Sequence, residues 1–226
     1  MKYELIGQTV PAVEITLNSG ETMVSQSGGM CWQTEGIKMS TNTNGGIMKG
    51  LGRMFAGESL FMNLYTAEKQ DAKITFASTL PGQIVPINLA DYPNGIIAQK
   101  GAFLCSEKSV NLKVTLTKRF TSGLFGGEGF ILEDISGIGH AFLEVDGDIV
   151  EKNLAPGEVL KVDTGNIVAF DKSVSYEIET VKGLSNIFFG GEGLFLTKLV
   201  GPGKVILQTQ NFNDFAGRII SRIPSK

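Results

Sequence analysis

One eight-residue segment occurs twice in nearly the same form and a third time in a weaker form. The copies read FGGEGFIL at 125–132, FGGEGLFL at 189–196 and FAGESLFM at 55–62, with offsets of 70 and 64 residues. A second landmark, a leucine that opens a glycine-containing turn, is spaced by 72 and 65 residues, at Leu17, Leu89 and Leu154. Two landmarks with one period predict internal repeats of one structural unit. We place the repeats at about 13–79, 84–146 and 149–210.

Within these ranges the hydrophobic periodicity is that of β-strands. Alternating or β-branched runs, such as 113–116, 158–162 and 176–179, are bounded by Gly, Pro, Asn and Asp. Glycine is abundant, 29 of 226 residues, and part of it falls at equivalent turns, at Gly20, Gly95 and Gly157. Repeats this small do not bury their own faces, so we expect one domain, residues 1–226. The expected fold is all-β, an antiparallel β-sandwich or β-prism-like body with pseudo-threefold repeats.

A helix is expected only near the C-terminus. Phe215, Ile219 and Ile223 recur at the spacing of one helix face, behind Asn213 or Asp214 as a cap. The glycine-rich run 47–55 favours no more than a short turn, because each internal glycine costs about 1 kcal/mol relative to alanine.

The supply of metal-binding and redox side chains is small. His140 is the only histidine, and Cys31 and Cys105 are the only cysteines, 74 positions apart. We therefore expect no metal site and no cofactor, and two free buried thiols in a reducing compartment. A net charge of −3 argues against nucleic-acid binding. With no apolar leader or spanning segment in the sequence, the expected location is cytoplasmic.

The repeated glycine-rich loop admits two interpretations. Its glycines lead into strand-like residues rather than a helix, and a glutamate sits at its centre, which argues against a phosphate-binding loop. We favour a tight turn whose glutamate accepts backbone N–H bonds. Alternatively, the three glutamates converge and bind a hard cation. The loop residues in question are Gly57, Glu58, Gly127, Glu128, Gly191 and Glu192.

Apolar residues cluster just before each of these loops. They have three candidate roles: covering the ends of the core, joining subunits, or touching a membrane surface. Few basic residues lie nearby, so attraction to anionic lipid is expected to be small, and core covering is favoured, with subunit contact second. The candidate interaction residues are Leu51, Met54, Phe55, Leu124, Phe125, Leu184 and Phe188.

His140 is the one side chain that titrates near neutrality without perturbation, which makes it a candidate general base. Its counterparts in the other repeats are Lys73 and Lys204. A position that accepts lysine twice favours a polar strand start over a catalytic base. Cys31 and Cys105 lie close to equivalent positions, where the third repeat has Ala169, which indicates small buried sites.

The segment from Gly45 to Phe61, followed by two FGGEG copies, resembles the altered-inheritance-of-mitochondria family (member twenty-four). The resemblance spans nearly the whole chain. It implies a β-sandwich fold grouped with the tryptophan RNA-binding attenuator protein. For mitochondrial members it implies a role in inner-membrane organisation. It supplies no catalytic or ligand-binding residue to map onto this chain.

These observations predict a non-enzymatic β-scaffold or protein-interaction protein of the mitochondrial-biogenesis-factor-like family, which forms a homo-oligomer and contacts a protein partner. The alternative is a small-molecule-binding module with a pocket between repeats. An enzyme would need a convergent acid–base pair, and the sequence shows no spacing that predicts one.

Overall fold

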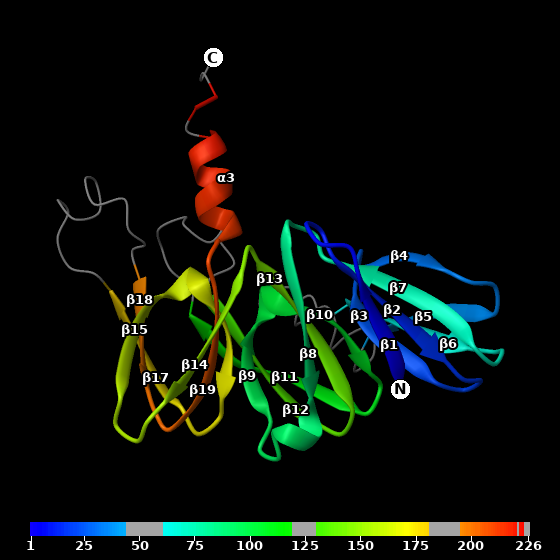
Figure 1. Ribbon diagram of the computed structural model, residues 1–226, viewed down its shortest axis with the longest axis horizontal. Helices are drawn as coiled ribbons and strands as arrows, with labels where there is room; N and C mark the ends of the chain where they lie inside the picture. Colours follow the sequence, from blue (N-terminus) through cyan, green and yellow to red (C-terminus); the bar gives the residue numbers. More distant parts are fainter. Residues whose placement is uncertain (44–60, 119–129, 181–194, 221, 224–226) are drawn as a thin grey trace. The chain divides into compact units, whose positions relative to one another are not determined.

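The structure is a computed structural model that describes residues 1–43, 61–118, 130–180, 195–220 and 222–223. Strands dominate the described chain, and their four sheets are antiparallel (Figure 1). The described residues include one α-helix, α3 (Phe212–Ile220), near the C-terminus. The predicted all-β class with a short C-terminal helix is confirmed, although Ile223 lies beyond the last residue of α3.

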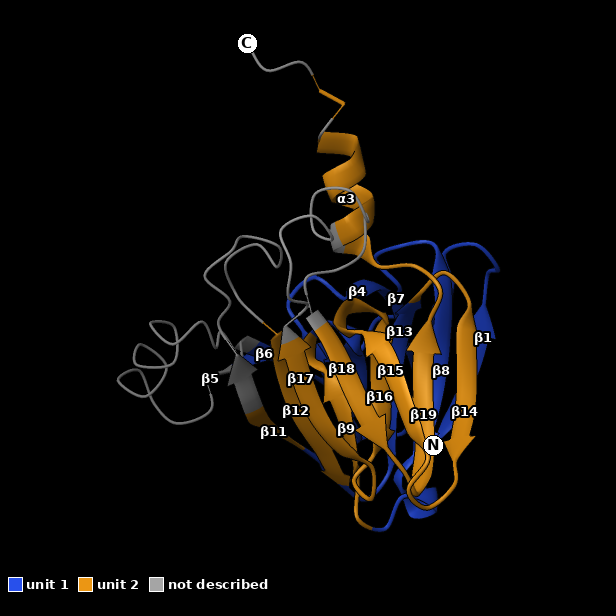
Figure 2. Cartoon of the chain, turned by 90° about the vertical axis from the view of Figure 1, so that its left-hand side faces the viewer, with its two compact units in different colours: residues 1–93, 101–111, 137–145 blue, residues 94–100, 112–136, 146–226 orange. Residues whose placement is uncertain are grey.

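The chain divides into two compact units, coloured separately in Figure 2. Unit 1 comprises Met1–Pro93, Gly101–Asn111 and Gly137–Val145, and unit 2 comprises Asn94–Lys100, Leu112–Ser136 and Asp146–Lys226. The predicted second repeat, 84–146, thus contributes strands to both units.

Unit 1 contains a four-stranded sheet, in the order β1-β2-β7-β4, and a six-stranded sheet, in the order β5-β6-β3-β10-β13-β8. Its strands are β1 (Lys2–Ile6), β2 (Ala12–Leu17), β3 (Thr22–Gln26), β4 (Met30–Gln33), β5 (Ile37–Thr43), β6 (Phe61–Ala67), β7 (Ala72–Ala77), β8 (Gly82–Asn88), β10 (Phe103–Glu107) and β13 (His140–Asp146). Alternation in β2 turns Val13, Ile15 and Leu17 inward and leaves Glu14 and Thr16 partly exposed. Both sheets contribute to one core, which joins these residues to Tyr65 and Phe142, among others.

Unit 2 repeats this plan with a six-stranded sheet, β11-β12-β9-β16-β19-β14, and a three-stranded sheet, β15-β18-β17. Its strands are β9 (Ile96–Gln99), β11 (Val110–Lys118), β12 (Phe130–Gly137), β14 (Ile149–Leu154), β15 (Val159–Asp163), β16 (Ile167–Asp171), β17 (Ser175–Thr180), β18 (Phe195–Val200) and β19 (Gly203–Gln208). Across both units, the described residues form three short 3-10 helices, η1 (Leu89–Asp91) in unit 1, η2 (Lys100–Ala102), and η3 (Thr164–Asn166) in unit 2. The core contains Phe130 and Phe170 from the larger sheet and Val162 and Leu199 from the smaller one.

The strand pairing follows one scheme in each of the three predicted ranges. Each range takes in six strands: β2–β7, β8–β13 and β14–β19. In every set the first strand pairs with the sixth, the second with the fifth, the third with the sixth and the fourth with the fifth. The third strand also carries a register shift in each set, at Cys31, Leu104 and Val168. The repeats themselves stay a prediction, which this scheme supports.

One turn shows why the sequence pattern repeats. The Glu21 carboxylate accepts the Asn18 N–H at 2.7 Å, and the Glu158 carboxylate accepts the Ala155 N–H at 2.8 Å. The preceding glycines, Gly20 and Gly157, have φ of +90° and +77°, which only glycine adopts without strain. The shared Leu, Gly and Glu of the two segments therefore build the same turn.

One of the two cysteines differs from its prediction. Cys105 is free and buried as expected, whereas Cys31 is free but exposed, so the prediction of a buried thiol is wrong there. The reason is position: β10 lies between β3 and β13, but β4 ends its sheet in the described chain. Cys105 pairs with Phe142, which lies two residues after His140. The equivalent residue in the first predicted repeat is Thr75, two residues after Lys73, and it pairs with Trp32 rather than with Cys31.

Candidate functional site

The residues predicted to form a site from the sequence all lie outside the described residues. These are the loop residues Gly57, Glu58, Gly127, Glu128, Gly191 and Glu192, and the apolar residues Leu51, Met54, Phe55, Leu124, Phe125, Leu184 and Phe188. Their convergence and their role stay predictions.

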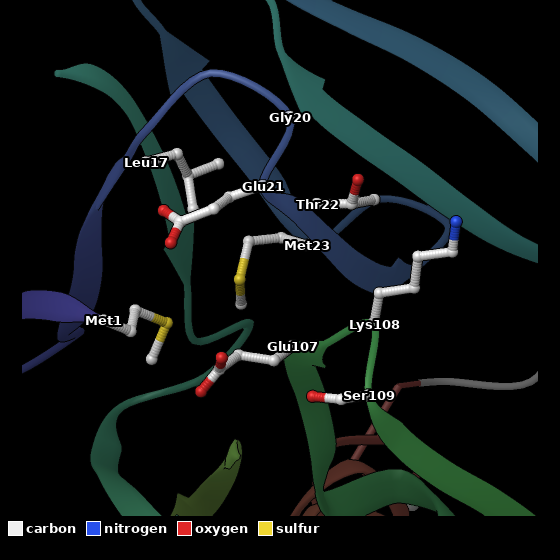
Figure 3. A pocket seen from close by; sticks show the side chains of 9 residues that line it. All are labelled: Met1, Leu17, Gly20, Glu21, Thr22, Met23, Glu107, Lys108 and Ser109. Carbon is white, nitrogen blue, oxygen red and sulfur yellow. The ribbon is translucent and has the colours of Figure 1, made fainter. Parts of the chain in front are cut away.

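Unit 1 contains a pocket of about 440 Å³ at the junction of β3 and β10 (Figure 3). The carboxylates of Glu21 and Glu107 and the thioethers of Met1 and Met23 line it, as Figure 3 shows. The remaining lining residues are Leu17, Gly20, Thr22, Lys108 and Ser109. Apart from Met1, the lining residues fall in the first and second predicted repeats, and the alternative function predicted from the sequence stays a prediction.

Backbone pairing holds these walls in place. The Lys108 N–H donates to the Thr22 carbonyl at 3.1 Å, which ties the end of β10 to the start of β3. Met23 is fully buried, so its side chain forms the floor on the core side. The Ser109 hydroxyl donates to the Ile138 carbonyl at 2.6 Å, which occupies its only proton.

The pocket carboxylates already serve the backbone. Glu21 accepts the Asn18 N–H, and one oxygen of Glu107 accepts the His140 N–H at 2.8 Å and lies 2.9 Å from His140 Nδ1. Two carboxylates beside the exposed Met1 side chain suit a small cationic ligand with an apolar part. The arrangement has no activated nucleophile, since Ser109 is bonded to a carbonyl rather than to a base.

The position of His140 has the same backbone contact in all three predicted repeats. The N–H of Lys73 donates to Thr34 Oγ1 at 2.9 Å, and the N–H of Lys204 donates to Asp171 Oδ2 at 2.8 Å. His140 makes the equivalent bond to Glu107. The geometry therefore supports a structural strand start, as the Lys, His, Lys series suggested.

Glu133 is a buried acid that the sequence reasoning did not single out. It lies on β12 opposite Ala98 of β9, with 0% of its surface exposed. Neither carboxylate oxygen has a hydrogen-bond partner in the described part of the chain. Burial raises the pKa of Glu133 to about 7, and the charge of Lys100 opposes the rise. A signal for its burial was present in the sequence, because Glu133 lies within the largely apolar run FILEDI at 130–135.

Unit 2 exposes an apolar stripe on α3, which we define as Phe212, Phe215, Ile219 and Ile220. These side chains are between 46% and 67% exposed. Two hydrogen bonds to Asp146 hold the N-terminal end of α3. The Phe212 N–H donates to Asp146 Oδ2 at 3.1 Å, and the Gln210 N–H donates to the Asp146 carbonyl. The helix is thus held at its N-terminal end and exposes the apolar stripe.

Two kinds of feature are absent from the described residues. Groups of three or more His, Cys, Asp or Glu residues suited to a metal ion are absent from these residues. Among the same residues, none of the helices has the length and hydropathy needed to span a membrane.

Comparison with known proteins shows similarity over nearly the whole chain. The family model described as mitochondrial biogenesis AIM24 matches residues 3–210. An uncharacterized protein of Streptococcus pyogenes serotype M6 is 30% identical over 223 residues, which cover 95% of this chain and 88% of that protein. The crystal structure of protein SPYM3_0169 from Streptococcus pyogenes matches with a TM-score of 0.80 and 28% identity, covering 98% of this chain and 99% of that one.

Proposed function

The chain belongs to the mitochondrial biogenesis AIM24 family, and we propose that it is a non-catalytic scaffold that binds protein partners and copies of itself. The observation that carries this proposal is the exposed α3 stripe. Monomeric proteins seldom expose contiguous large apolar side chains without a binding role. An amphipathic helix rooted at one end fits an apolar groove on a partner protein, with anchors about one turn apart.

The three predicted repeats are part of the same proposal. The shared pairing scheme and the shared Glu21 and Glu158 turns support repeats of one β unit. Stacked repeats give a rigid platform with extended faces, a form that suits binding more than chemistry.

Site-specific photo-crosslinking tests the scaffold function. A photoreactive phenylalanine analogue at Phe215 is expected to crosslink in cells to a discrete protein, identified by mass spectrometry. The same analogue at Lys152, exposed on β14 of unit 2, is the control and should not yield that product. The adduct should disappear when Ile219→Ser and Ile220→Ser are introduced beside the probe. A stripe that crosslinks only to lipid, or to no protein at all, would contradict the proposal.

The pocket at β3 and β10 favours a second candidate, a small-molecule-binding module. Its support is the placement of the Glu21 and Glu107 carboxylates beside the exposed Met1 side chain in one pocket. Native mass spectrometry of freshly purified protein is the test. A stoichiometric cationic adduct that Glu107→Gln removes, and that Glu68→Gln on the same unit retains, would support this candidate. A clean spectrum would count against it.

A further inference from the structure

Two strand pairings in the molecule connect one predicted repeat to the next. In unit 1, β3 pairs with β10, and in unit 2, β9 pairs with β16. Each pairing joins the second strand of one repeat to the third strand of the following repeat, in antiparallel orientation. We call such a pairing a junction. Both junctions lie at the centre of a six-stranded sheet.

The same rule leaves two strands without their junction. The second strand of the third repeat is β15, and the third strand of the first repeat is β4. In the described chain, β15 ends the three-stranded sheet β15-β18-β17, and β4 ends the four-stranded sheet β1-β2-β7-β4 (Figure 1). These edges are the two halves of one missing junction.

We propose that β4 of one molecule pairs antiparallel with β15 of a second copy of this chain. A second copy is the partner that the two existing junctions indicate. Each junction joins a repeat to the repeat that follows it, and after the third repeat of one copy the pattern continues with the first repeat of another copy. The new junction would join the four-stranded and three-stranded sheets into one sheet. The proposal deepens the scaffold function, on which it rests for its purpose, by naming the self-association surface.

The two existing junctions fix the register. Cys105 faces Ser25 in the first, and Ala169 faces Ala98 in the second. Trp32 holds the matching place on β4. Cys105 and Ala169 pair with the residues that lie two positions after His140 and Lys204, respectively. Trp32 likewise pairs with Thr75, two positions after Lys73. Val162 holds the matching place on β15, opposite Thr197. The register therefore places Trp32 opposite Val162, Gln33 opposite Lys161 and Thr34 opposite Leu160.

Side-chain exposure at the open edges supports this assignment. Trp32 is 53% exposed, whereas its counterparts Cys105 and Ala169 are 0% exposed in their junctions. On the other edge Val159 is 51% exposed. Cys31 is exposed, although its counterparts Leu104 and Val168 are buried. Trp32 and Cys31 on β4 thus lie uncovered where their counterparts in the other two predicted repeats are buried.

Backbone chemistry points the same way. An edge strand presents a row of unpaired N–H and C=O groups, and natural proteins usually protect it with charge or proline. β4 has the sequence MCWQ, with neither. Added strands bind such edges through main-chain hydrogen bonds. Because β4 and β15 are different surfaces, the contact is head-to-tail, and repetition gives a ring or an open chain.

Mixed single-cysteine variants test the contact. In a Cys31→Ser background, Gln33→Cys protein is mixed under mild oxidation with Lys161→Cys protein carrying a different tag. We expect a disulfide-linked dimer that contains both tags. Gln33→Cys mixed with Val159→Cys, two positions out of register, is the matched control and should crosslink far less. Because each chain holds one introduced cysteine, an intrachain bond between the introduced residues cannot form.

The outcomes separate cleanly. No mixed dimer, or a double variant, Gln33→Cys with Lys161→Cys, that forms only an intrachain disulfide, overturns the proposal. Light scattering gives a second measurement: Trp32→Glu should lower the mass of the assembly to that of the monomer, while Met39→Glu, at a similarly exposed site on β5, should not. Equal masses for both variants also overturn it. The α3 crosslinks use other residues, so failure of the scaffold function is seen independently.

Discussion

Glu133 is a buried side chain whose ionisation is linked to folding. Its pKa rises from an ordinary value of 4.5 in the unfolded chain to about 7 in the fold, chiefly through burial. Below pH 4.5 both states hold the proton and the group has no effect. As the pH rises to 7 the unfolded chain releases its proton first, so the free energy of unfolding falls, by up to about 3 kcal/mol.

Glu133→Gln should remove that pH dependence. The variant and the natural chain should be similarly stable near pH 4, and the variant should be more stable at pH 8, because glutamine imitates the protonated acid. Urea unfolding at the two pH values measures the difference. Glu177→Gln, on the exposed surface of β17, is the control and should show no such trend. A variant that is destabilised equally at both pH values would refute the linkage.

The Lys, His, Lys series leads to a second prediction at the residue scale. His140→Lys keeps the backbone N–H that Glu107 accepts, so we expect a loss of less than about 1 kcal/mol. Glu107→Ala removes the acceptor and leaves a part-buried N–H without it, at a cost of about 1–3 kcal/mol. Thermal unfolding of both variants gives the comparison. Equal losses would mean that the imidazole itself matters.

At the scale of single elements, α3 depends on a residue outside the helix. Asp146 accepts the N–H of Phe212, the first residue of α3, as a helix-capping side chain does. Asp146→Ala should weaken the first turn by about 1 kcal/mol and speed amide hydrogen exchange across 212–220. Asp148→Ala is the control, since Asp148 contacts Thr209 through its backbone. Unchanged exchange in Asp146→Ala would show that the cap is dispensable.

Elements were predictable from the sequence where the periodicity was local. Alternation gave the strands that became β15 and β17, and a helical spacing gave α3. The exposure of Cys31 was not predictable, because it depends on whether β4 has a second neighbour, and strand neighbours are set by pairing between distant segments. The pocket was missed for the same reason, since Glu21 and Glu107 meet only through the β3–β10 pairing.

At the scale of the whole molecule, the exchange of strands between predicted repeats determines what can fold alone. The first predicted repeat supplies β5, β6 and β3 to the six-stranded sheet of unit 1, but β10, β13 and β8 come from the second. The shared core includes Leu104, Cys105 and Phe142 from those later strands. A fragment of residues 1–79 would therefore lose half of that sheet and leave Met23 and Tyr65 without their covering partners.

We expect fragment 1–79 to unfold without cooperativity and fragment 1–146, which contains every strand of unit 1, to unfold cooperatively in urea. The physical reason is that fragment 1–79 lacks β10, β13 and β8. Without these three strands, too few apolar side chains are buried to stabilise the two remaining sheets. Circular dichroism and amide dispersion in NMR spectra measure the difference. Cooperative unfolding of 1–79 alone would show that each predicted repeat has its own core. It would contradict the expectation that the repeats depend on one another, which also underlies the proposed junction between copies.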